Sequence, residues 1–309
     1  MNIRPTCSLS WRREPVTVSI HQALTQATRV LVASDTARLD AEVLLACVLG
    51  KARSYLFSRP ETELSDEHSA AFAALVTRRA AGEPVAYLTG MRGFWTLDLK
   101  VTSAVLIPRP ETELLVELAL MLAQRVGDGR PDAPLVVADL GTGSGAIALA
   151  LASERPHWQI HASDRSEQAL DVARHNAGRL GLESVNFVQG DWCDALPAGV
   201  GFDMIVSNPP YIAGEDPHLV RGDLVFEPRS ALVADERGLR DLATICRQSG
   251  LWLRDGGYLL LEHGYEQAAD VRTLLTSAGF ENVRSERDLA GHERVTLGRR
   301  ATSGENTYA

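Results

Sequence analysis

The chain has 309 residues, of which 45% are hydrophobic and 23% are charged, and its formal net charge is −9. This composition is close to that of average folded domains, so it excludes a disordered or fibrous protein. The first 108 residues hold 12 Lys and Arg against 10 Asp and Glu, and the remainder holds 19 against 30. The resulting formal net charges of +2 for the first part and −11 for the second argue against direct nucleic-acid binding, which usually requires a basic surface.

Apolar runs in the chain are all shorter than the roughly 18 residues that a membrane helix needs. No continuous apolar segment of a secretory signal follows the first arginines. The four cysteines are scattered without a CxxC pair, which is typical of a reducing compartment and of neither a disulfide framework nor a zinc site. His157 and His161 lie in an extended stretch, so their spacing is not that of helical metal ligands. We expect a cytoplasmic protein with no membrane segment and no metal.

Residues 17–84 predict a small helical domain. Apolar residues recur at helical spacing in two stretches: Ile20, Leu24, Ala27 and Leu31, then Leu39, Val43 and Cys47 after a cap at Asp35. A third helix is expected to begin at Ser65 and to end before Gly82, because Pro84 prevents its continuation. Residues 1–16 form an extension to which we assign no role.

Residues 85–108 predict a β-hairpin that links two domains. Two sets of side chains alternate there: Phe94, Thr96, Asp98 and Lys100, and Trp95, Leu97, Leu99 and Val101. An amphipathic helix is then expected over residues 111–125, followed by a turn-rich break over residues 127–134.

Apolar strands alternate with helices after Pro134. The expected strands cover residues 135–139, 158–163, 185–188, 202–207, 258–262, 281–286 and 294–297, and the expected helices cover residues 146–154, 167–180, 239–254 and 266–278. This order predicts an α/β fold with a doubly wound, mostly parallel sheet of seven strands. The final hairpin implies one antiparallel strand near the sheet edge. We assign residues 109–300 to this domain and residues 301–309 to a tail.

A glycine-rich loop joins the first strand of this sheet to its helix. It consists of Gly141, Thr142, Gly143, Ser144 and Gly145, directly after Asp139-Leu140. Such a loop lets a ligand approach the backbone closely and directs helix-terminal N–H groups at a negative group. Its G-x-G-x-G spacing differs from the G-x-G-x-x-G of dinucleotide-binding proteins.

Acidic and aromatic residues follow the next two strands at the same sheet edge. Asp164 ends the second strand, where a carboxylate can accept hydrogen bonds from both hydroxyls of a ribose. Asp191 and Trp192 follow the third strand, where a carboxylate can bind an exocyclic amine and an indole can cover an adenine. Together with the loop, these residues predict an adenosine-containing cofactor.

The tetrapeptide Asn208-Pro209-Pro210-Tyr211 follows the fourth strand, beside the predicted cofactor cleft. Two prolines fix two φ angles, and Pro209 excludes Asn208 from the helical region. The resulting stiff turn presents a side-chain amide oxygen and a carbonyl oxygen, which suit a planar –NH₂ group with two hydrogens to donate. Tyr211 can lie against the flat face of that group.

The DLGTGSG loop and the NPPY turn resemble those of class I S-adenosylmethionine-dependent methyltransferases that act on amide or exocyclic nitrogens. The span from about residue 17 to residue 300 is similar to the protein-(glutamine-N5) methyltransferases that modify peptide chain release factors. The narrower stretches that carry this resemblance are IPRPETE at 107–113, VSNPPYI at 206–212, FEP at 226–228, LEHG at 261–264 and ERVTLGR at 293–299.

The resemblance implies a Rossmann-like methyltransferase that uses S-adenosylmethionine on the GGQ glutamine of class-1 release factors and so modulates translation termination. It implies that Gly141 to Gly145, Asp164, Trp192 and Asn208 bind the cofactor, with Asp191 as a further candidate. It implies that Asn208 to Tyr211 hold the glutamine and form the catalytic turn, and that the helical domain docks the protein substrate. Glu111 and Glu113 either border the cofactor or serve the helix dipole.

Three other functions remain open at this level. The same turn suits glutamine methylation of a ribosomal protein, and it also suits adenine-N6 methylation of nucleic acid. The adenine reading is disfavoured by the acidic balance and by the lack of a basic, aromatic-rich insert. A binding module without chemistry is disfavoured by the intact NPPY turn.

Overall fold

A computed structural model describes residues 18–126, 134–220 and 222–302 of the chain. The predicted extension, most of the predicted break after residue 126 and the end of the tail lie outside these residues. The chain divides into two compact units, one ending at Thr89 and one beginning at Gly90. Among the described residues, no helix is both long enough and apolar enough to span a bilayer.

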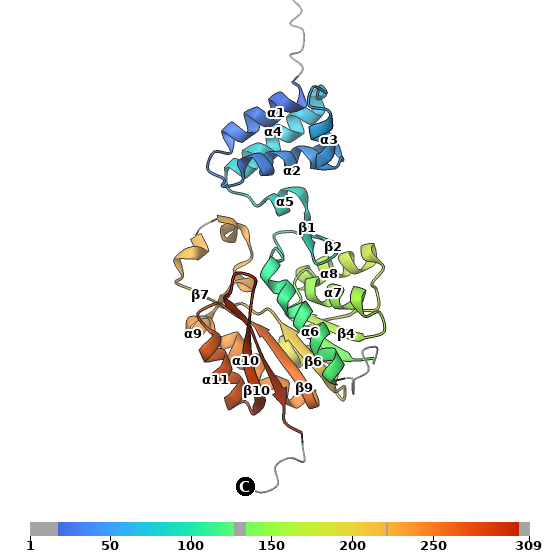
Figure 1. Cartoon of the computed structure of the whole chain (residues 1–309), viewed down its shortest axis with the longest axis vertical. Helices are drawn as coiled ribbons and strands as arrows, with labels where there is room; N and C mark the ends of the chain where they lie inside the picture. The colour runs from blue at the N-terminus through green and yellow to red at the C-terminus, as the bar shows by residue number, and fades with distance from the viewer. Residues whose placement is uncertain (1–17, 127–133, 221, 303–309) are drawn as a thin grey trace, which may run out of the picture. The chain divides into compact units, whose positions relative to one another are not determined.

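The first unit is a bundle of helices around one apolar core (Figure 1). Its helices are α1 (Ile20–Val30), α2 (Ala37–Leu49), α3 (Arg53–Ser58), α4 (Asp66–Ala80) and α5 (Val85–Thr89). Ser19 and Gln22 form a reciprocal capping box at the start of α1. The helix predicted to begin at Ser65 is α4, with Ser65 as its N-cap residue, and Gly82 follows its end with a positive φ of 98°.

Three sequence predictions in this unit were wrong. Thr36, not Asp35, is the N-cap residue of α2. The face of α2 that packs in the core includes Leu44 and Leu45, whereas Leu39 is 42% exposed. Residues 85–89, which we expected to begin a β-rich stretch, form the helix α5. The error about α2 arises because the spacing of apolar residues cannot tell which of two neighbouring stripes meets the rest of the bundle.

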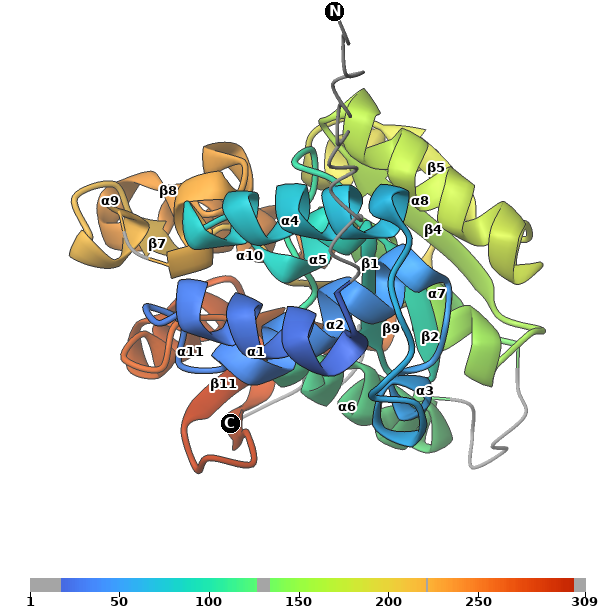
Figure 2. The ribbon, with the colours of Figure 1, turned by 90° about the horizontal axis from the view of Figure 1, so that it is seen from above.

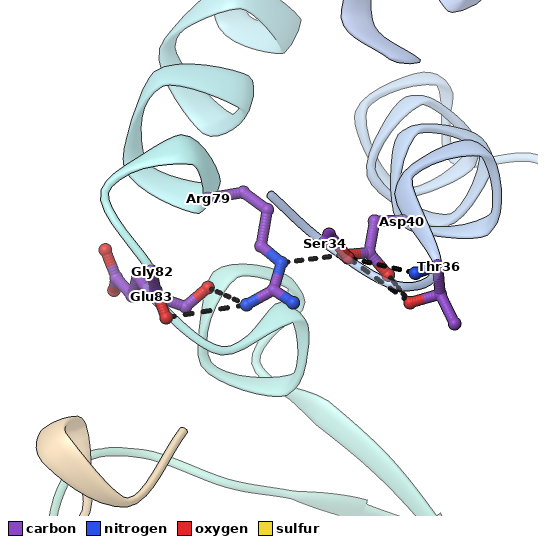
Figure 3. A network of polar contacts seen from close by, with 6 residues as sticks. All are labelled: Ser34, Thr36, Asp40, Arg79, Gly82 and Glu83. Carbon is purple, nitrogen blue, oxygen red and sulfur yellow. Dashed lines mark hydrogen bonds and ion pairs between the residues drawn. The ribbon is translucent and has the colours of Figure 1, made fainter. Parts of the chain in front are cut away.

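A polar network joins α2 to the end of α4 (Figure 3). Arg79 Nε donates to Asp40 Oδ2 at 2.7 Å, and its Nη1 donates to the carbonyl oxygens of Gly82 and Glu83 at 3.4 and 3.2 Å. Ser34 and Thr36 donate their hydroxyls to the same carboxylate, each at 2.8 Å. Burial alone would raise the pKa of Asp40, but these hydrogen bonds lower it below its usual value.

The second unit begins with the predicted hairpin and contains the predicted sheet. β1 (Met91–Phe94) and β2 (Leu97–Lys100) pair with Phe94 opposite Leu97, and Trp95 turns the chain with a positive φ of 56°. Phe94 is therefore buried, although the sequence pattern grouped it with polar residues. The turn shifts the alternation because it inserts two residues that belong to neither strand.

The main sheet has seven strands in the order β10-β11-β9-β6-β3-β4-β5. The strands are β3 (Val136–Leu140), β4 (Gln159–Asp164), β5 (Asn186–Gln189), β6 (Phe202–Ser207), β9 (Leu253–Glu262), β10 (Phe280–Arg287) and β11 (Glu293–Arg300). β3, β4, β5, β6 and β9 are parallel, and β11 is antiparallel to both of its neighbours. This confirms the predicted doubly wound sheet and its single reversed strand next to the edge.

Helices cover both faces of the sheet, as the alternating pattern predicted (Figure 1). α6 (Glu113–Val126) and α7 (Ala146–Glu154) pack on one face, where α8 (Glu167–Leu180) lies beside β4 and β5 (Figure 2). α10 (Arg240–Trp252) and α11 (Ala268–Ser277) pack on the other face. Strand order reverses between β3 and β6, because β3 leads to β4 on one side and β6 lies on the other. Ligands of such sheets bind at the carboxyl ends of the strands at this point.

Short elements lie between β6 and α10, a segment in which no periodic pattern of apolar residues predicted them. β7 (Ile212–Ala213) pairs with β8 (Val233–Ala234), and α9 (Asp235–Gly238) follows. Short 3₁₀ helices cover Pro110–Thr112, Trp192–Ala195, Pro217–Val220, Gly222–Phe226 and Arg229–Ala231.

Candidate active site

The glycine loop follows β3, and the side chain of Asp139 in β3 holds it in place through hydrogen bonds. Thr142 Oγ1 donates to Asp139 Oδ2 at 2.6 Å, and the backbone N–H of Ala148 donates to the same oxygen at 3.2 Å. Complete burial raises the pKa of Asp139 to about 7, against the opposing effect of these hydrogen bonds. Oδ1 has no hydrogen-bond partner among the described residues. The carboxyl therefore ties the loop to the start of α7 and retains one free acceptor.

All three glycines of the loop are required by its shape. Gly141, Gly143 and Gly145 have φ angles of 73°, 57° and 85°, a region that favours glycine. A Cβ on Gly141 would lie 3.1 Å from the indole ring of Trp192, whereas a Cβ on Gly143 would meet open space. The loop thus packs against Trp192 on one side and leaves its backbone accessible at Gly143.

Asp164 ends β4 and supports the loop from the side. Its Oδ2 accepts a hydrogen bond from the Gly143 N–H at 2.9 Å, and its Oδ1 accepts one from the Ser166 N–H at 2.9 Å. Burial raises the pKa of Asp164, and the two N–H groups oppose this shift. An ionised carboxylate has about four acceptor sites, so Asp164 keeps capacity for two more donors.

A large cavity opens where these residues meet. Its empty space is about 930 Å³, part of it open to solvent. Its walls include Gly141 to Ser144, Asp164, Asp191, Trp192, Asn208 and Pro210, together with Arg109 and Thr112. The structure therefore brings most of the residues predicted to bind the cofactor to one cavity.

Two sets of predicted residues do not line it. Gly145 is packed, because a Cβ there would lie 3.0 Å from Leu149. Glu111 and Glu113 are absent from the cavity wall, and Glu113 Oε1 instead accepts a hydrogen bond from the Trp95 N–H at 2.8 Å. Glu113 thus joins the start of α6 to the turn of the β1–β2 hairpin.

The NPPY turn follows β6, and its two side chains have buried partners. Asn208 Nδ2 donates to Thr112 Oγ1 at 3.0 Å. Tyr211 Oη donates to Glu262 Oε1 at 3.3 Å, and burial raises the pKa of Tyr211 far above its usual value. Gln267 Nε2 donates to the carbonyl oxygen of Tyr211 at 3.0 Å. The turn is therefore held from α11, from the end of β9 and from the segment before α6.

A small cavity lies on the other side of Asn208. Its walls are largely apolar and comprise Leu106, Arg109, Asn208, Pro209, Tyr211, Ile212, Leu224, Ala231 and Leu232. Asn208 belongs to the walls of both cavities. Leu106, Arg109 and Ala231 also belong to both walls, so the larger and the smaller cavity adjoin each other at this turn.

The sequence pattern predicted no function for four residues of this region, although they lie in the stretches PRPETE, FEP and LEHG that carry the family resemblance. They are Arg109, Thr112, Glu227 and Glu262. Only the partners of these side chains show what they do, and those partners are far away in sequence. No group of His, Cys, Asp or Glu in the described part of the chain has the arrangement of a metal site.

Comparison with known proteins places the chain in a family. Residues 22–90 match the PrmC N-terminal domain, and residues 121–235 match the Methyltransferase small domain. The release factor glutamine methyltransferase of Vibrio cholerae is 50% identical over 94% of this chain and 100% of that protein. The chain belongs to the release factor glutamine methyltransferase family.

Other members of this family give the same result. The Escherichia coli enzyme is 50% identical over 89% of this chain and 97% of its own length, and the Xylella fastidiosa enzyme is 52% identical over 85% and 93%. Among solved structures, the catalytic domain of hMettl16 has a TM-score of 0.52 at 16% identity, covering 76% of this chain and 84% of that one. This last likeness shows a shared methyltransferase fold.

Proposed function

We propose that this chain transfers a methyl group from S-adenosylmethionine to the side-chain amide nitrogen of a glutamine in class-1 release factors. The single observation that carries this is the position of Asn208, which lies in the walls of both cavities of the site. A hydrogen-bond acceptor at that junction can hold the nitrogen of a glutamine side chain in the small cavity beside a methyl donor in the large cavity. Relatives that are 50% identical in sequence to this chain and are named release factor glutamine methyltransferase support the choice of substrate.

The large cavity fits S-adenosylmethionine, which supplies an electrophilic methyl group on a sulfonium ion when it is bound. The backbone at Gly143 faces open space, and Asp139 keeps a buried acceptor beneath the loop. In this proposal, the glycine loop binds the methionine end, Asp164 accepts hydrogen bonds from the ribose hydroxyls and Trp192 contacts the adenine. Asp191 is a further contact, since it lies in the same wall.

The small cavity fits the side chain of glutamine. Apolar walls from Leu106, Ile212, Leu224 and Leu232 suit the two CH₂ groups, and the NPPY turn supplies the acceptors. Asn208 Oδ1 and the carbonyl oxygen of Pro209 would each accept one N–H of the amide. Tyr211 would lie against the flat face of the amide. The pocket thus offers each part of a carboxamide side chain a matching surface.

Positioning supplies most of the catalysis in this proposal. An amide nitrogen is a weak nucleophile because its lone pair is delocalised into the carbonyl. Two fixed acceptors would orient the nitrogen toward the methyl carbon, and orientation of this kind contributes about 7–11 kcal/mol in the best cases. They would also stabilise the positive charge that develops on the nitrogen during transfer. No strong base is needed, because the alkylated nitrogen loses its proton readily to solvent.

The release factor is the proposed partner, and the helical unit is its proposed docking site. We divide the chain accordingly into a docking domain over residues 17–84, a linking segment over residues 85–108 that holds α5 and the β1–β2 hairpin, and a methyltransferase domain over residues 109–300. The match of residues 22–90 to the PrmC N-terminal domain supports a separate first domain.

Mass spectrometry of a class-1 release factor after incubation with this protein and S-adenosylmethionine tests the proposal. We expect a gain of one CH₂ unit on the GGQ peptide, and none with Asn208→Ala. Ribosomal proteins and nucleic acid are included as competing substrates with methyl-labelled cofactor. Label in either of them, with an unmodified release factor, would overturn the proposed substrate.

A further inference from the structure

We propose that Glu262 and Thr112 are positioning residues that fix the orientation of the Asn208 side-chain amide, so that its oxygen faces the substrate. The inference rests on the proposed function, because the oriented oxygen is the acceptor assigned to the glutamine amide. It adds two residues that do not line the small cavity, of which Thr112 lies in the wall of the large one.

The sheet brings the three residues together. β6 and β9 are neighbouring parallel strands with Ser207 opposite Leu261, so Asn208 and Glu262 leave them side by side at the same edge. Thr112 lies in the 3₁₀ turn just before α6 and is 4% exposed, and Glu262 is 1% exposed. Asn208 Nδ2 lies 3.0 Å from Thr112 Oγ1. Glu262 Oε1 accepts a hydrogen bond from Tyr211 Oη at 3.3 Å, and the Thr112 hydroxyl lowers the pKa of the same carboxyl.

The direction of these contacts follows from the chemistry of a carboxylate. An ionised carboxylate only accepts hydrogen bonds, so the Thr112 hydroxyl directs its proton toward Glu262. Its oxygen is then left as an acceptor and attracts the NH₂ end of the Asn208 amide. The two ends of an asparagine amide have almost the same shape, so only such partners decide which end points where. The oxygen of Asn208 is therefore left for the cavities.

The surroundings of Glu262 make this orientation depend on its charge. Complete burial raises the pKa of Glu262 to about 7, while the hydroxyls of Thr112 and Tyr211 and the more distant Arg294 lower it and Glu111 raises it. No described residue forms an ion pair with this carboxyl, and Oε2 accepts no well-aligned hydrogen bond from the described part of the chain. A protonated Glu262 could donate to Thr112, and the direction of the contacts would then no longer be fixed.

Three variants test the proposal. Thr112→Val keeps the shape and removes the hydroxyl, Thr112→Ser keeps the hydroxyl, and Glu262→Gln keeps the size and adds a donor. We expect kcat for release factor methylation to fall roughly ten- to one-hundredfold in Thr112→Val and Glu262→Gln. The dissociation constant of S-adenosylmethionine should stay within about twofold of wild type in both, and Thr112→Ser should recover most of kcat. The wild-type rate should fall below about pH 7, and Glu262→Gln should lack this acidic limb.

Thr296→Val is the matched control, because it also removes a buried hydroxyl. Thr296 is fully buried in β11 and is bonded to His263 Nε2 at 2.8 Å and to Ser285 Oγ at 2.7 Å, away from both cavities. We expect it to alter thermal stability and to leave kcat and its pH profile unchanged. A folded Thr112→Val variant with wild-type kcat would overturn the proposal, as would an equal loss in Thr112→Val and Thr296→Val.

Side-chain amide NMR separates this inference from the proposed function. In protein labelled with ¹⁵N at asparagine, the NH₂ protons of Asn208 should exchange slowly with solvent in wild type and Thr296→Val. They should exchange at least tenfold faster in Thr112→Val, because their acceptor is gone. An unchanged rate would contradict the orientation. A wild-type protein that shows the slow exchange but never methylates a release factor would instead contradict the proposed function alone.

Discussion

Arg109 donates a hydrogen bond from its guanidinium to the carboxylate of Glu227, although 118 positions separate the two residues in the chain. The Glu227 side chain is fully buried, and its second oxygen accepts from the Ile107 N–H at 3.3 Å. Arg109 lines both cavities of the site. The pair therefore connects the segment before α6 to the segment between β7 and β8, which contributes Leu224, Ala231 and Leu232 to the wall of the small cavity.

Removal of Arg109 should loosen this wall. Burial raises the pKa of Glu227, and Arg109 opposes that shift, so Arg109→Ala leaves a buried carboxyl without its charge partner. We expect the free energy of unfolding to fall by about 2 kcal/mol and the KM for release factor to rise. Thermal unfolding and steady-state kinetics measure the two effects. The double variant Arg109→Leu/Glu227→Leu should be more stable than Arg109→Ala, and a less stable double variant would contradict this account.

Substitution of Asn208 should separate catalysis from cofactor binding. Asn208→Ala removes the acceptor at the junction of the cavities, and we expect kcat to fall by about 10²- to 10³-fold. Calorimetric titration with S-adenosylmethionine should give an affinity close to that of wild type. Asn186→Ala, an exposed amide on β5, is the control and should leave both quantities unchanged. A near-normal rate in Asn208→Ala would remove Asn208 from the catalytic role.

Asp164 should matter chiefly for cofactor affinity. In Asp164→Asn, one carboxylate oxygen becomes an NH₂ group that faces either the Gly143 N–H or the Ser166 N–H, and two donors then oppose each other. We expect the dissociation constant of S-adenosylmethionine to rise roughly tenfold or more, with a smaller change in kcat at saturating cofactor. Asp171→Asn changes an exposed carboxylate on α8 and serves as the control. Equal affinities for the two variants would argue against a ribose contact at Asp164.

The charge of Glu262 should reduce stability at high pH. Its pKa rises from 4.5 to about 7 on folding, so the folded state holds this proton more tightly than the unfolded state. The stability that this group contributes is therefore complete below pH 4.5 and is lost as the pH rises through about 7. Glu262→Gln carries no such charge. At about pH 8 we expect the free energy of unfolding of Glu262→Gln to exceed that of wild type by about 1–3 kcal/mol. The variant should therefore unfold at a higher temperature.

The comparison at about pH 5 is the internal control for this last prediction, because wild-type Glu262 is then mostly protonated when folded. The stabilisation should shrink or vanish there. Asp139, whose pKa burial also raises to about 7, is present in both proteins and cancels from the difference. A stabilisation of the same size at both pH values would show that packing, and not charge, is responsible.

The sequence by itself determined the order of strands and helices in the methyltransferase domain. Strands such as β6 are apolar on both faces, which only a sheet covered by helices on both sides accommodates, and helices such as α8 have a cap and a terminal glycine. It also determined that the glycine loop, Asp164, Trp192 and Asn208 lie at one edge of the sheet. Parallel strands place their carboxyl ends together, so residues at those ends meet whatever the loops do.

Only the tertiary structure decided which side chains hold the site in place. Thr112 and Glu227 lie in short stretches with no periodicity of their own, Glu262 is the last residue of β9, and each is defined by a partner about 50 to 120 positions away. The face of α2 that meets the core and the turn at Trp95 were also beyond the sequence pattern. The spacing of apolar residues along a segment predicts its conformation. The direction of a buried hydrogen bond instead depends on which groups the rest of the fold places opposite it.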